Sequence, residues 1–310
     1  MRKHDPTYIT AREMAGRQRE ISVSEFFLKN RHLLGFDSPA KALLTTVKEA
    51  VDNALDACEE AGILPDIRVQ VIEVEQNVHR VIVEDNGPGI LENQIARIFG
   101  KLLYGSKFHK LSQSRGQQGM GISAAGMYAQ LTTGKSLHVI SRVKGERMAS
   151  ELHVSVDTTR NKPQMHGKKK IKWDRPHGTW IEAEMEGRYQ RGTHSVEMYL
   201  KQTAIANPCA SFHFQGPHGE AITHKRSSKE LPPPPVEIKP HPRCVELGRL
   251  IQMLNSTQSR HLLQFLQNEF SRVGPKTARQ IIETAGRNLT ERSLPKRIAH
   301  VQANALYRAI

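Results

Sequence analysis

A run of prolines divides the chain into two parts. Residues 231–242 read LPPPPVEIKPHP. Proline lacks the N–H that a helix interior or a central strand requires, so this segment is expected to be a stiff, extended linker. The chain has 310 residues, enough for two domains of ordinary size. We therefore expect one domain at 1–228 and a second at 229–310.

The first part mixes helix and strand patterns. Ser38 followed by Pro39 is a typical helix start and Gly62 a typical stop, so a helix is predicted over 39–61. Segments rich in β-branched residues predict strands. The expected strands are 67–74, 79–85, 137–143, 151–156 and 179–185, and the other expected helices are 91–99 and 121–131. This order indicates an α+β fold, a two-layer sandwich in which helices cover one face of a sheet.

The second part is helical and strongly basic. Apolar residues recur at helical spacing in 244–254, 258–270, 275–285 and 295–310. Residues 229–310 contain 13 Lys or Arg against 6 Asp or Glu, a net charge of +7 and half of the chain's +14. A field of this sign favours polyanionic partners such as nucleic acid.

Composition excludes several classes of protein. No apolar stretch approaches the ~20 residues of a membrane helix, and the polar N-terminus lacks the apolar core of a secretory signal, so no membrane partner is expected. Cys58, Cys209 and Cys244 are scattered and cannot pair off evenly, which favours a reduced, cytoplasmic setting. The 15 histidines show no HxxxH or Cys/His spacing, so the sequence assigns no structural metal.

The helix predicted over 39–61 has two contrasting faces. One is an apolar stripe that includes Val47, Val51 and Leu55. The other gathers Glu49, Asp52, Asn53 and Asp56. A solvated acidic face is the simpler interpretation, but asparagine is a poor helix former. A carboxylate and an amide at i and i+4, as in Glu49 and Asn53, can point at one ligand.

Three further motifs follow along the chain. DNGPGI (85–90) places an aspartate after a strand and then two glycines, which let main chain approach a ligand closely. RGQQGMGIS (115–123) leads glycines into a helix, whose free N–H groups suit phosphate. HGTWIE (177–182) places Thr179 at the start of a late strand. Each motif alone is equally compatible with an ordinary turn or surface loop.

Together, in this order, the four pieces resemble the nucleotide pocket of the GHKL ATPases, shared by gyrase-type topoisomerases, MutL proteins, heat-shock chaperones and histidine kinases. Residues 21–57 and the stretch LLYGSKFHKLSQSRGQQGMGIS (102–123) narrow the resemblance to the B subunits of topoisomerase VI, the type IIB DNA topoisomerases. It extends along essentially the whole chain. It implies a GHKL (Bergerat) ATP-binding domain followed by a small all-α helix-two-turns-helix domain.

The resemblance also implies ATP and Mg²⁺ as cofactors. Glu49 would orient and polarise the water that attacks the γ-phosphate, and Asn53 would hold Mg²⁺. Asp85 would accept a hydrogen bond from the adenine amino group, and Gly89 would leave room for the base. The other expected nucleotide-binding residues, most of them in a lid over the phosphates, are Ser106, Lys107, Arg115, Gly116, Gln117, Gln118, Gly119, Met120, Gly121, Ile122 and Thr179.

The implied partners are a second copy of the chain, bound when ATP is bound, a topoisomerase VI A subunit that cleaves DNA, and duplex DNA in a prokaryotic nucleoid. In FSRVGPKTARQII (270–282), a glycine turn precedes a helix with Lys276 and Arg279, which would contact DNA phosphates. The family's transducer domain supplies a switch lysine, and we expect no such domain within these 310 residues.

Other interpretations remain open. The chain would also fit an ATP-binding clamp or scaffold without strand passage, and its basic second part would fit a helical spacer that touches no DNA. A histidine kinase is disfavoured, because no dimerising heptad helix precedes the pocket. AQLTTGKS (129–136) resembles a loose Walker A motif but follows a predicted helix and leads into a strand, the reverse of a P-loop. GKKKIK (167–172) is interpreted as an exposed hairpin.

Overall fold

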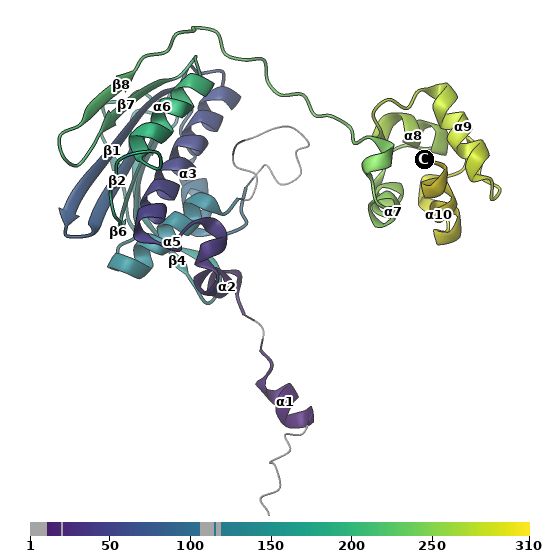
Figure 1. Cartoon of the computed structure of the whole chain (residues 1–310), viewed down its shortest axis with the longest axis horizontal. Coiled ribbons are helices and arrows are strands. Elements are labelled where there is room, and N and C mark those ends of the chain that lie inside the picture. Colours follow the sequence, from purple (N-terminus) through teal and green to yellow (C-terminus); the bar gives the residue numbers. More distant parts are fainter. Residues whose placement is uncertain (1–10, 20, 106–114, 116–118) are drawn as a thin grey trace, which may run out of the picture. The chain divides into compact units, whose positions relative to one another are not determined.

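The computed structural model describes residues 11–19, 21–105, 115 and 119–310 (Figure 1). Two compact units follow one another along the chain, one ending at Pro234 and one running from Pro235 to Ile310, and each is described by itself. The division falls inside the proline run. Among the described residues, no helix combines the length and the apolar character that crossing a bilayer requires.

The first unit is built on a mixed sheet, which in the described residues has eight strands in the order β5-β4-β3-β6-β2-β1-β7-β8. Neighbouring strands pair antiparallel, except β1 and β7, which pair parallel. The strands are β1 (Asp66–Glu75), β2 (Val78–Glu84), β3 (Leu137–Arg142), β4 (Ala149–Asp157), β5 (Lys162–Ile171), β6 (Gly178–Glu186), β7 (Ser211–Gln215) and β8 (Ala221–His224).

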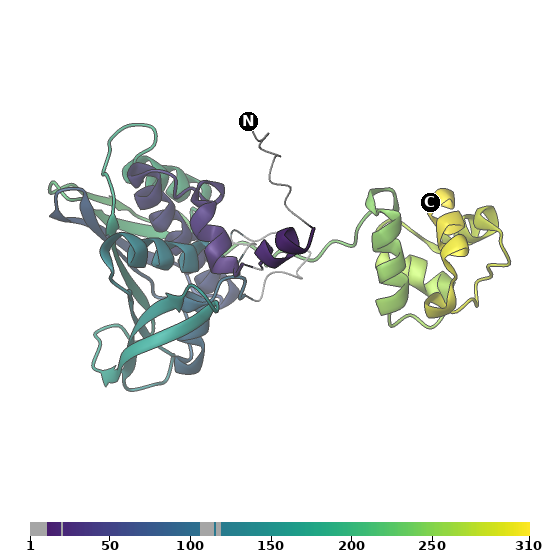
Figure 2. The same cartoon turned by 90° about the horizontal axis from the view of Figure 1, so that it is seen from below.

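Helices α3, α5 and α6 pack on one face of this sheet (Figures 1 and 2). Successive side chains of a strand point to opposite faces, so Val69 and Val71 of β1 and Val81 and Val83 of β2 are buried beneath the helices. The predicted two-layer α+β fold is confirmed. The helices of this unit are α1 (Ala11–Arg17), α2 (Val23–Lys29), η1 (Arg31–Leu34), α3 (Pro39–Glu60), α4 (Glu92–Gly100), α5 (Gly121–Thr133) and α6 (Val196–Ala206).

Helix α3 starts as predicted. The Ser38 hydroxyl accepts a hydrogen bond from the N–H of Lys41 at 3.4 Å, and Pro39 occupies the first helical position, where its missing N–H costs nothing. The apolar stripe of Val47, Val51 and Leu55 is completely buried against the sheet. The opposite, polar face is therefore held in place by the packing of the core.

The other face of the sheet is polar. Arg80 of β2 forms an ion pair with Glu184 of β6, with 3.0 Å between nitrogen and oxygen, and Lys135 contacts the same carboxylate at 2.5 Å. Arg80 also lies 3.5 Å from Glu182, two residues earlier on β6. Cross-strand charge pairs of this kind stabilise a sheet face that no apolar layer covers.

The second unit is a small helical bundle with its own core. Its elements are η2 (Pro242–Cys244), α7 (Leu247–Ser256), α8 (Leu262–Glu269), α9 (Pro275–Ala285), η3 (Pro295–Arg297) and α10 (His300–Ala309). Phe265 and Phe270 are buried at its centre, edge to face with 5.7 Å between ring centroids. The helix predicted over 295–310 is in fact split, because Ile298 and Ala299 are extended between η3 and α10.

The sequence did not predict seven elements of the first unit, which are α1, α2, η1, α6, β5, β7 and β8. Strand β5 contains residues 167–171 of the lysine-rich GKKKIK segment and forms a hairpin with β4. Nearly all of its residues are exposed, so it lacks the apolar alternation by which a half-buried strand is recognised. Helix α6 did carry a signal, since the Ser195 hydroxyl accepts a hydrogen bond from the N–H of Met198 at 3.1 Å as its N-cap.

Candidate functional site

A cavity of about 1040 Å³ lies between α3, the loop from β2 to α4, the start of α5, and β6. This is the upper end of the size range of small-molecule sites, roughly 300–1,000 Å³. Four segments that are far apart in the sequence therefore meet at one cavity. The predicted residues that line the cavity are Glu49, Asn53, Asp85, Gly89, Arg115, Gly119, Met120, Gly121, Ile122 and Thr179. Ser106, Lys107, Gly116, Gln117 and Gln118 lie outside the described residues.

Asp85 is buried at the end of β2. Its Oδ1 accepts hydrogen bonds from the N–H of Gly87 at 2.8 Å and from the N–H of Thr179 at 3.1 Å. Burial raises the pKa of the carboxyl to about 6, although the two backbone hydrogen bonds and the charge of Arg175 lower it. Among the described residues both hydrogen bonds go to Oδ1, so Oδ2 is the oxygen left for a donor that enters the cavity.

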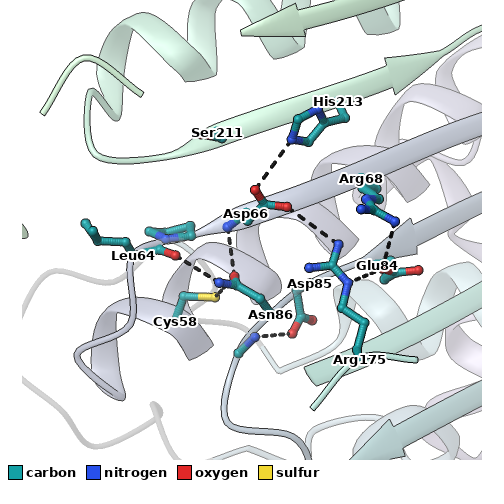
Figure 3. A network of polar contacts seen from close by, with 12 residues as sticks. Cys58, Leu64, Asp66, Arg68, Glu84, Asp85, Asn86, Arg175, Ser211 and His213 are labelled. Carbon is teal, nitrogen blue, oxygen red and sulfur yellow. Dashed lines mark hydrogen bonds and ion pairs between the residues drawn. The ribbon is translucent and has the colours of Figure 1, made fainter. Parts of the chain in front are cut away.

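Asn86 fastens the loop after Asp85 to its surroundings (Figure 3). Its amide oxygen accepts hydrogen bonds from the N–H of Asp66 at 2.8 Å and from the thiol of Cys58 at 3.6 Å. Its amide nitrogen donates to the carbonyl of Leu64 at 3.0 Å. Both ends of the amide are used, so the side chain positions this loop. Sequence reasoning missed this role, because Asn before Gly is also an ordinary turn signal.

Arg175, in the connection between β5 and β6, holds the ends of two strands together (Figure 3). Its guanidinium forms an ion pair with Glu84 at the end of β2 and lies 3.5 Å from Asp66 at the start of β1. Asp66 also lies 3.5 Å from His213 of β7. The same guanidinium lowers the pKa of Asp85. No local motif marked Arg175 in the sequence, since its partners lie about 100 residues away.

Two glycines allow close contacts between main-chain segments around Asp85. Gly89 has φ +77°, and a Cβ there would lie 2.1 Å from the carbonyl oxygen of Arg142. Gly178 has φ +135°, and a Cβ there would lie 2.1 Å from the carbonyl oxygen of Asp85. The resemblance to the GHKL ATPases explains Gly89 by the space that the adenine base requires. The structure adds a different reason, which is the approach of the loop to β3.

Glu49 extends from α3 to the start of α5. Its carboxylate occupies the space where Gly121 has no side chain, because a Cβ on Gly121 would lie 1.6 Å from its Oε2. Burial, and then the neighbouring charge of Asp52, raises the pKa of Glu49. Asp52 accepts a hydrogen bond from the hydroxyl of Tyr199 at 3.1 Å. A carboxylate with a raised pKa is well suited to accept a proton.

The start of α5 offers unpaired donors to the cavity. The first hydrogen bond within this helix runs from the N–H of Ala124 to the carbonyl of Met120. The N–H groups of the preceding residues, Gly121 to Ser123, therefore have no acceptor inside the helix. Gly121 and Ile122 line the cavity. Such a helix start, with its partial positive charge, is a suitable place for a phosphate group.

Asn53 lies one turn beyond Glu49 on α3, exposed on the same side and lining the cavity. A carboxylate and an amide oxygen are hard ligands of the kind that Mg²⁺ binds while it keeps several waters. The amide oxygen of Asn53 therefore fits a magnesium ion that accompanies a phosphate ligand.

Arg115 lines the cavity, but its guanidinium is engaged by α3. It lies 2.8 Å from Asp56 and 2.7 Å from Glu59, and it donates to Asn207 at 2.5 Å. These contacts balance its charge and attach the predicted lid segment to the second half of α3. The sequence placed Arg115 in the lid without predicting these partners.

The remaining walls are mainly apolar, and the sequence did not predict them as part of the site. Phe99 of α4 and Ile181 of β6 line the cavity, as does the half-buried Leu34 before α3. Tyr104 donates a hydrogen bond to Gln94 at 2.7 Å beside them. Apolar walls with a few fixed polar groups are typical of a small-molecule site.

Comparisons with known proteins place this cavity in a family. Residues 42–177 match the domain family described as histidine kinase-, DNA gyrase B-, and HSP90-like ATPase. The B subunit of type 2 DNA topoisomerase 6 from Archaeoglobus fulgidus is 52% identical over 274 residues, which cover 88% of this chain and 45% of that protein. The corresponding protein of Methanococcoides burtonii is 49% identical over 297 residues, which cover 96% of this chain and 47% of that protein. Among solved structures, the Aquifex aeolicus MutL ATPase domain complexed with ADP covers 60% of this chain and 64% of its own, at 19% identity and a TM-score of 0.39.

The matched range contains Glu49, Asn53, Asp85 and Gly121, so the fold and the cavity define an ATPase domain of the histidine kinase, gyrase B and HSP90 class. Within this class, the identity of about half over most of the chain gives the particular family. The chain belongs to the family of type 2 DNA topoisomerase 6 B subunits. It spans about half the length of the curated relatives that it matches.

Asp85 should make the free energy of unfolding depend on pH. Its pKa is about 6 in the folded protein and about 3.9 in an unfolded chain. The folded state therefore binds more protons between these values, and stability falls as the pH rises from about 4 to about 6. Above this window the ionised, buried carboxylate costs roughly 3 kcal/mol. We expect Asp85→Asn, whose amide oxygen can still accept both backbone hydrogen bonds, to gain stability relative to the wild type as the pH rises from about 4 to about 6, and to keep this gain at higher pH.

Denaturant unfolding followed by tryptophan fluorescence measures this, because both tryptophans, Trp173 and Trp180, belong to the first unit. Asp37→Asn is the control. The hydrogen bond from Lys41 lowers the pKa of Asp37, so its removal should bring no gain at high pH. Parallel pH profiles for Asp85→Asn and the wild type would contradict the assignment.

Proposed function

We propose that this chain is the ATP-binding part of the B subunit of a type IIB DNA topoisomerase. Binding of ATP brings two copies together, and this gates the passage of one DNA duplex through a double-strand break made by a partner A subunit, which relaxes supercoils. The observation that carries the proposal is the cavity, which is lined by the buried carboxylate of Asp85, by Glu49 and Asn53 of α3, and by the start of α5.

ATP fits this cavity in one direction. Asp85 Oδ2 accepts the exocyclic amino group of adenine, which selects this base. The triphosphate then extends toward the free N–H groups of Gly121 and Ile122. Asn53 holds Mg²⁺, which neutralises charge on the phosphates. Glu49 orients the attacking water and accepts its proton, a task that its raised pKa supports.

Substitutions of Glu49 and of Asn53 on α3 should have different effects on ATP binding and hydrolysis. Glu49→Ala and Glu49→Gln should retain ATP affinity and lose hydrolysis by roughly 100-fold or more, because the residue acts on water. Asn53→Ala should lose Mg²⁺-dependent affinity, because the ion loses its protein ligand. Calorimetric titration with ATP, with and without Mg²⁺, and phosphate release measure the two effects. Lys41→Ala, an exposed change in the first turn of the same helix, serves as the control. Equal losses of affinity in the Glu49 and Asn53 variants would contradict these separate roles.

The segment before α3 supports ATP-dependent dimerisation. Phe27 and Phe36 are buried in the chain's own core, edge to face with 6.0 Å between ring centroids. Phe26 and Leu33, in contrast, are 49% and 62% exposed. The exposed side chains of Phe26 and Leu33 can therefore contact a second copy of the chain. Leu34, in the same segment, lines the nucleotide cavity of its own chain.

Light scattering with a non-hydrolysable ATP analogue should therefore show a dimer. Deletion of residues 1–20, and separately the double substitution of Phe26 and Leu33 by Ser, should weaken it. Ile205→Ser, on the equally exposed surface of α6, should leave the dimer unchanged. A monomer with and without nucleotide would refute this part of the proposal and would leave ATP binding intact.

Residues 229–310 are proposed to bind duplex DNA as a helix-two-turns-helix domain. Lys276 lies in the first turn of α9, where the helix leaves main-chain N–H groups unpaired, and it is exposed. Arg279 is exposed and forms an ion pair with Glu291 at 3.0 Å. An exposed pair of this kind contributes little stability, so a DNA phosphate can replace Glu291.

Binding should not depend on base sequence and should weaken steeply with salt. Each lost phosphate contact lowers the slope of log K against log salt by roughly 0.9, so Lys276→Ala with Arg279→Ala should flatten it by about 2. Fluorescence anisotropy on a labelled duplex checks this, with Lys296→Ala and Arg297→Ala, in η3 outside the glycine turn, as a matched control pair. Absence of binding even at low salt would favour a helical spacer, and with it a clamp or scaffold without strand passage.

The partner protein and the cellular location follow from the same proposal. The A subunit is the partner that breaks and rejoins DNA, and the complex acts on the nucleoid in the cytoplasm of a prokaryote. The sequence relationship to the B subunits supports both statements.

A further inference from the structure

Three potential metal ligands meet on the polar face of the sheet, away from the nucleotide cavity. His138 of β3 lies directly opposite His153 of β4 in the strand register. Glu151 is two residues before His153, so it points to the same face. The neighbouring residues Leu137 and Leu152 are buried on the other face, under the helices.

The three side chains lie within coordinating reach of one another. His138 Nε2 is 2.8 Å from Glu151 Oε1. The rings of His138 and His153 stack with 4.3 Å between centroids and 17° between planes. One ligand atom from each residue falls within 4.8 Å of the other two. Atoms bound to one ion at about 2.0–2.2 Å are themselves roughly 3–3.5 Å apart, so small side-chain rotations suffice to close the set.

Neighbouring side chains hold the ligands in place and leave one carboxylate oxygen of Glu151 for the ion. Lys169 of β5 contacts the second oxygen of Glu151, Oε2, at 3.1 Å, so Oε1 can bind an ion while this contact stays. Trp180 of β6 packs edge to face on His138 at 5.0 Å between centroids and fixes its ring.

The backbone of β4 and β5 next to His153 is irregular and leaves space for its imidazole ring. The pairing of β4 with β5 shifts register between Glu151 and His153, a β-bulge. Gly167 of β5 has φ +61°, and a Cβ there would lie 3.2 Å from Cδ2 of His153. The glycine therefore leaves space for the imidazole ring close to the main chain of β5. Bulges that redirect side chains are common next to binding sites.

We propose that His138, Glu151 and His153 form a binding site for a divalent transition-metal ion of the zinc type. Two imidazoles and one carboxylate are the donors that Zn²⁺ and Co²⁺ accept, whereas Mg²⁺ prefers oxygen ligands alone. Three protein ligands leave the remaining positions to water. The bound ion links β3 to β4 and replaces the hydrogen bond between His138 and Glu151. The site is independent of the nucleotide cavity and of the proposed topoisomerase function.

The experiment titrates the full chain with Co²⁺, followed by visible absorption, and with Zn²⁺, followed by calorimetry. We expect one ion per chain with a spectrum of nitrogen and oxygen ligands. His138→Gln, His153→Gln and Glu151→Gln should each weaken binding by about tenfold or more. Zn²⁺ should also raise the melting temperature of the wild type and not that of these variants. Their melting temperatures in a chelator then show whether each variant is folded.

His166→Gln is the matched control. His166 pairs with His153 in the register of β4 and β5, but its Nε2 faces Ser155 at 3.5 Å, so this change should leave the affinity unchanged. A sulfur-to-cobalt charge-transfer band would indicate cysteine ligands and overturn the proposal. The proposal is also overturned if the titration of the wild type does not show one bound ion per chain. It is overturned as well if His166→Gln weakens metal binding as much as His153→Gln. In these cases the cluster is only a polar cross-strand contact.

Discussion

The packing of helix α3 on the sheet is the interaction on which the rest of the first unit depends. Val47, Val51 and Leu55 are completely buried on one side of the helix, and Glu49 and Asn53 lie on the other. The same rigid helix therefore faces the core and the cavity. Side chains placed on such an element are positioned more accurately than side chains on loops. The other parts of the site, the end of β2 and the start of α5, are arranged around this helix.

Sequence reasoning predicted the elements whose signals are local. The N-cap at Ser38, the apolar stripe of α3 and the glycine-rich start of α5 each lie within a few residues of the structure that they specify, and these predictions were confirmed. The motif around Asp85 lies at the cavity. The contacts of Asn86 and Arg175 were not predicted, because they depend on strands that meet only in the folded sheet.

The same dependence on strand pairing explains why the sequence did not predict the cluster of His138, Glu151 and His153. A search for metal ligands in a sequence relies on short spacings, such as those along one helix. His138 and His153 are brought together by the pairing of two antiparallel strands, so their spacing of 15 residues reflects only the length of a hairpin. In a sheet protein, ligand sets of this kind become visible once the register is known.

The two edges of the sheet are each unsuited to pairing with another chain. Strand β5, at one edge, carries Lys168, Lys169 and Lys170, whose side chains are 57%, 62% and 48% exposed. Strand β8, at the other edge, is only four residues long. Charged and short edge strands oppose the sheet-to-sheet addition that leads to aggregation. Replacing these lysines with apolar residues would therefore reduce the solubility of the protein and would also remove their ion pairs with Glu92 and Glu151.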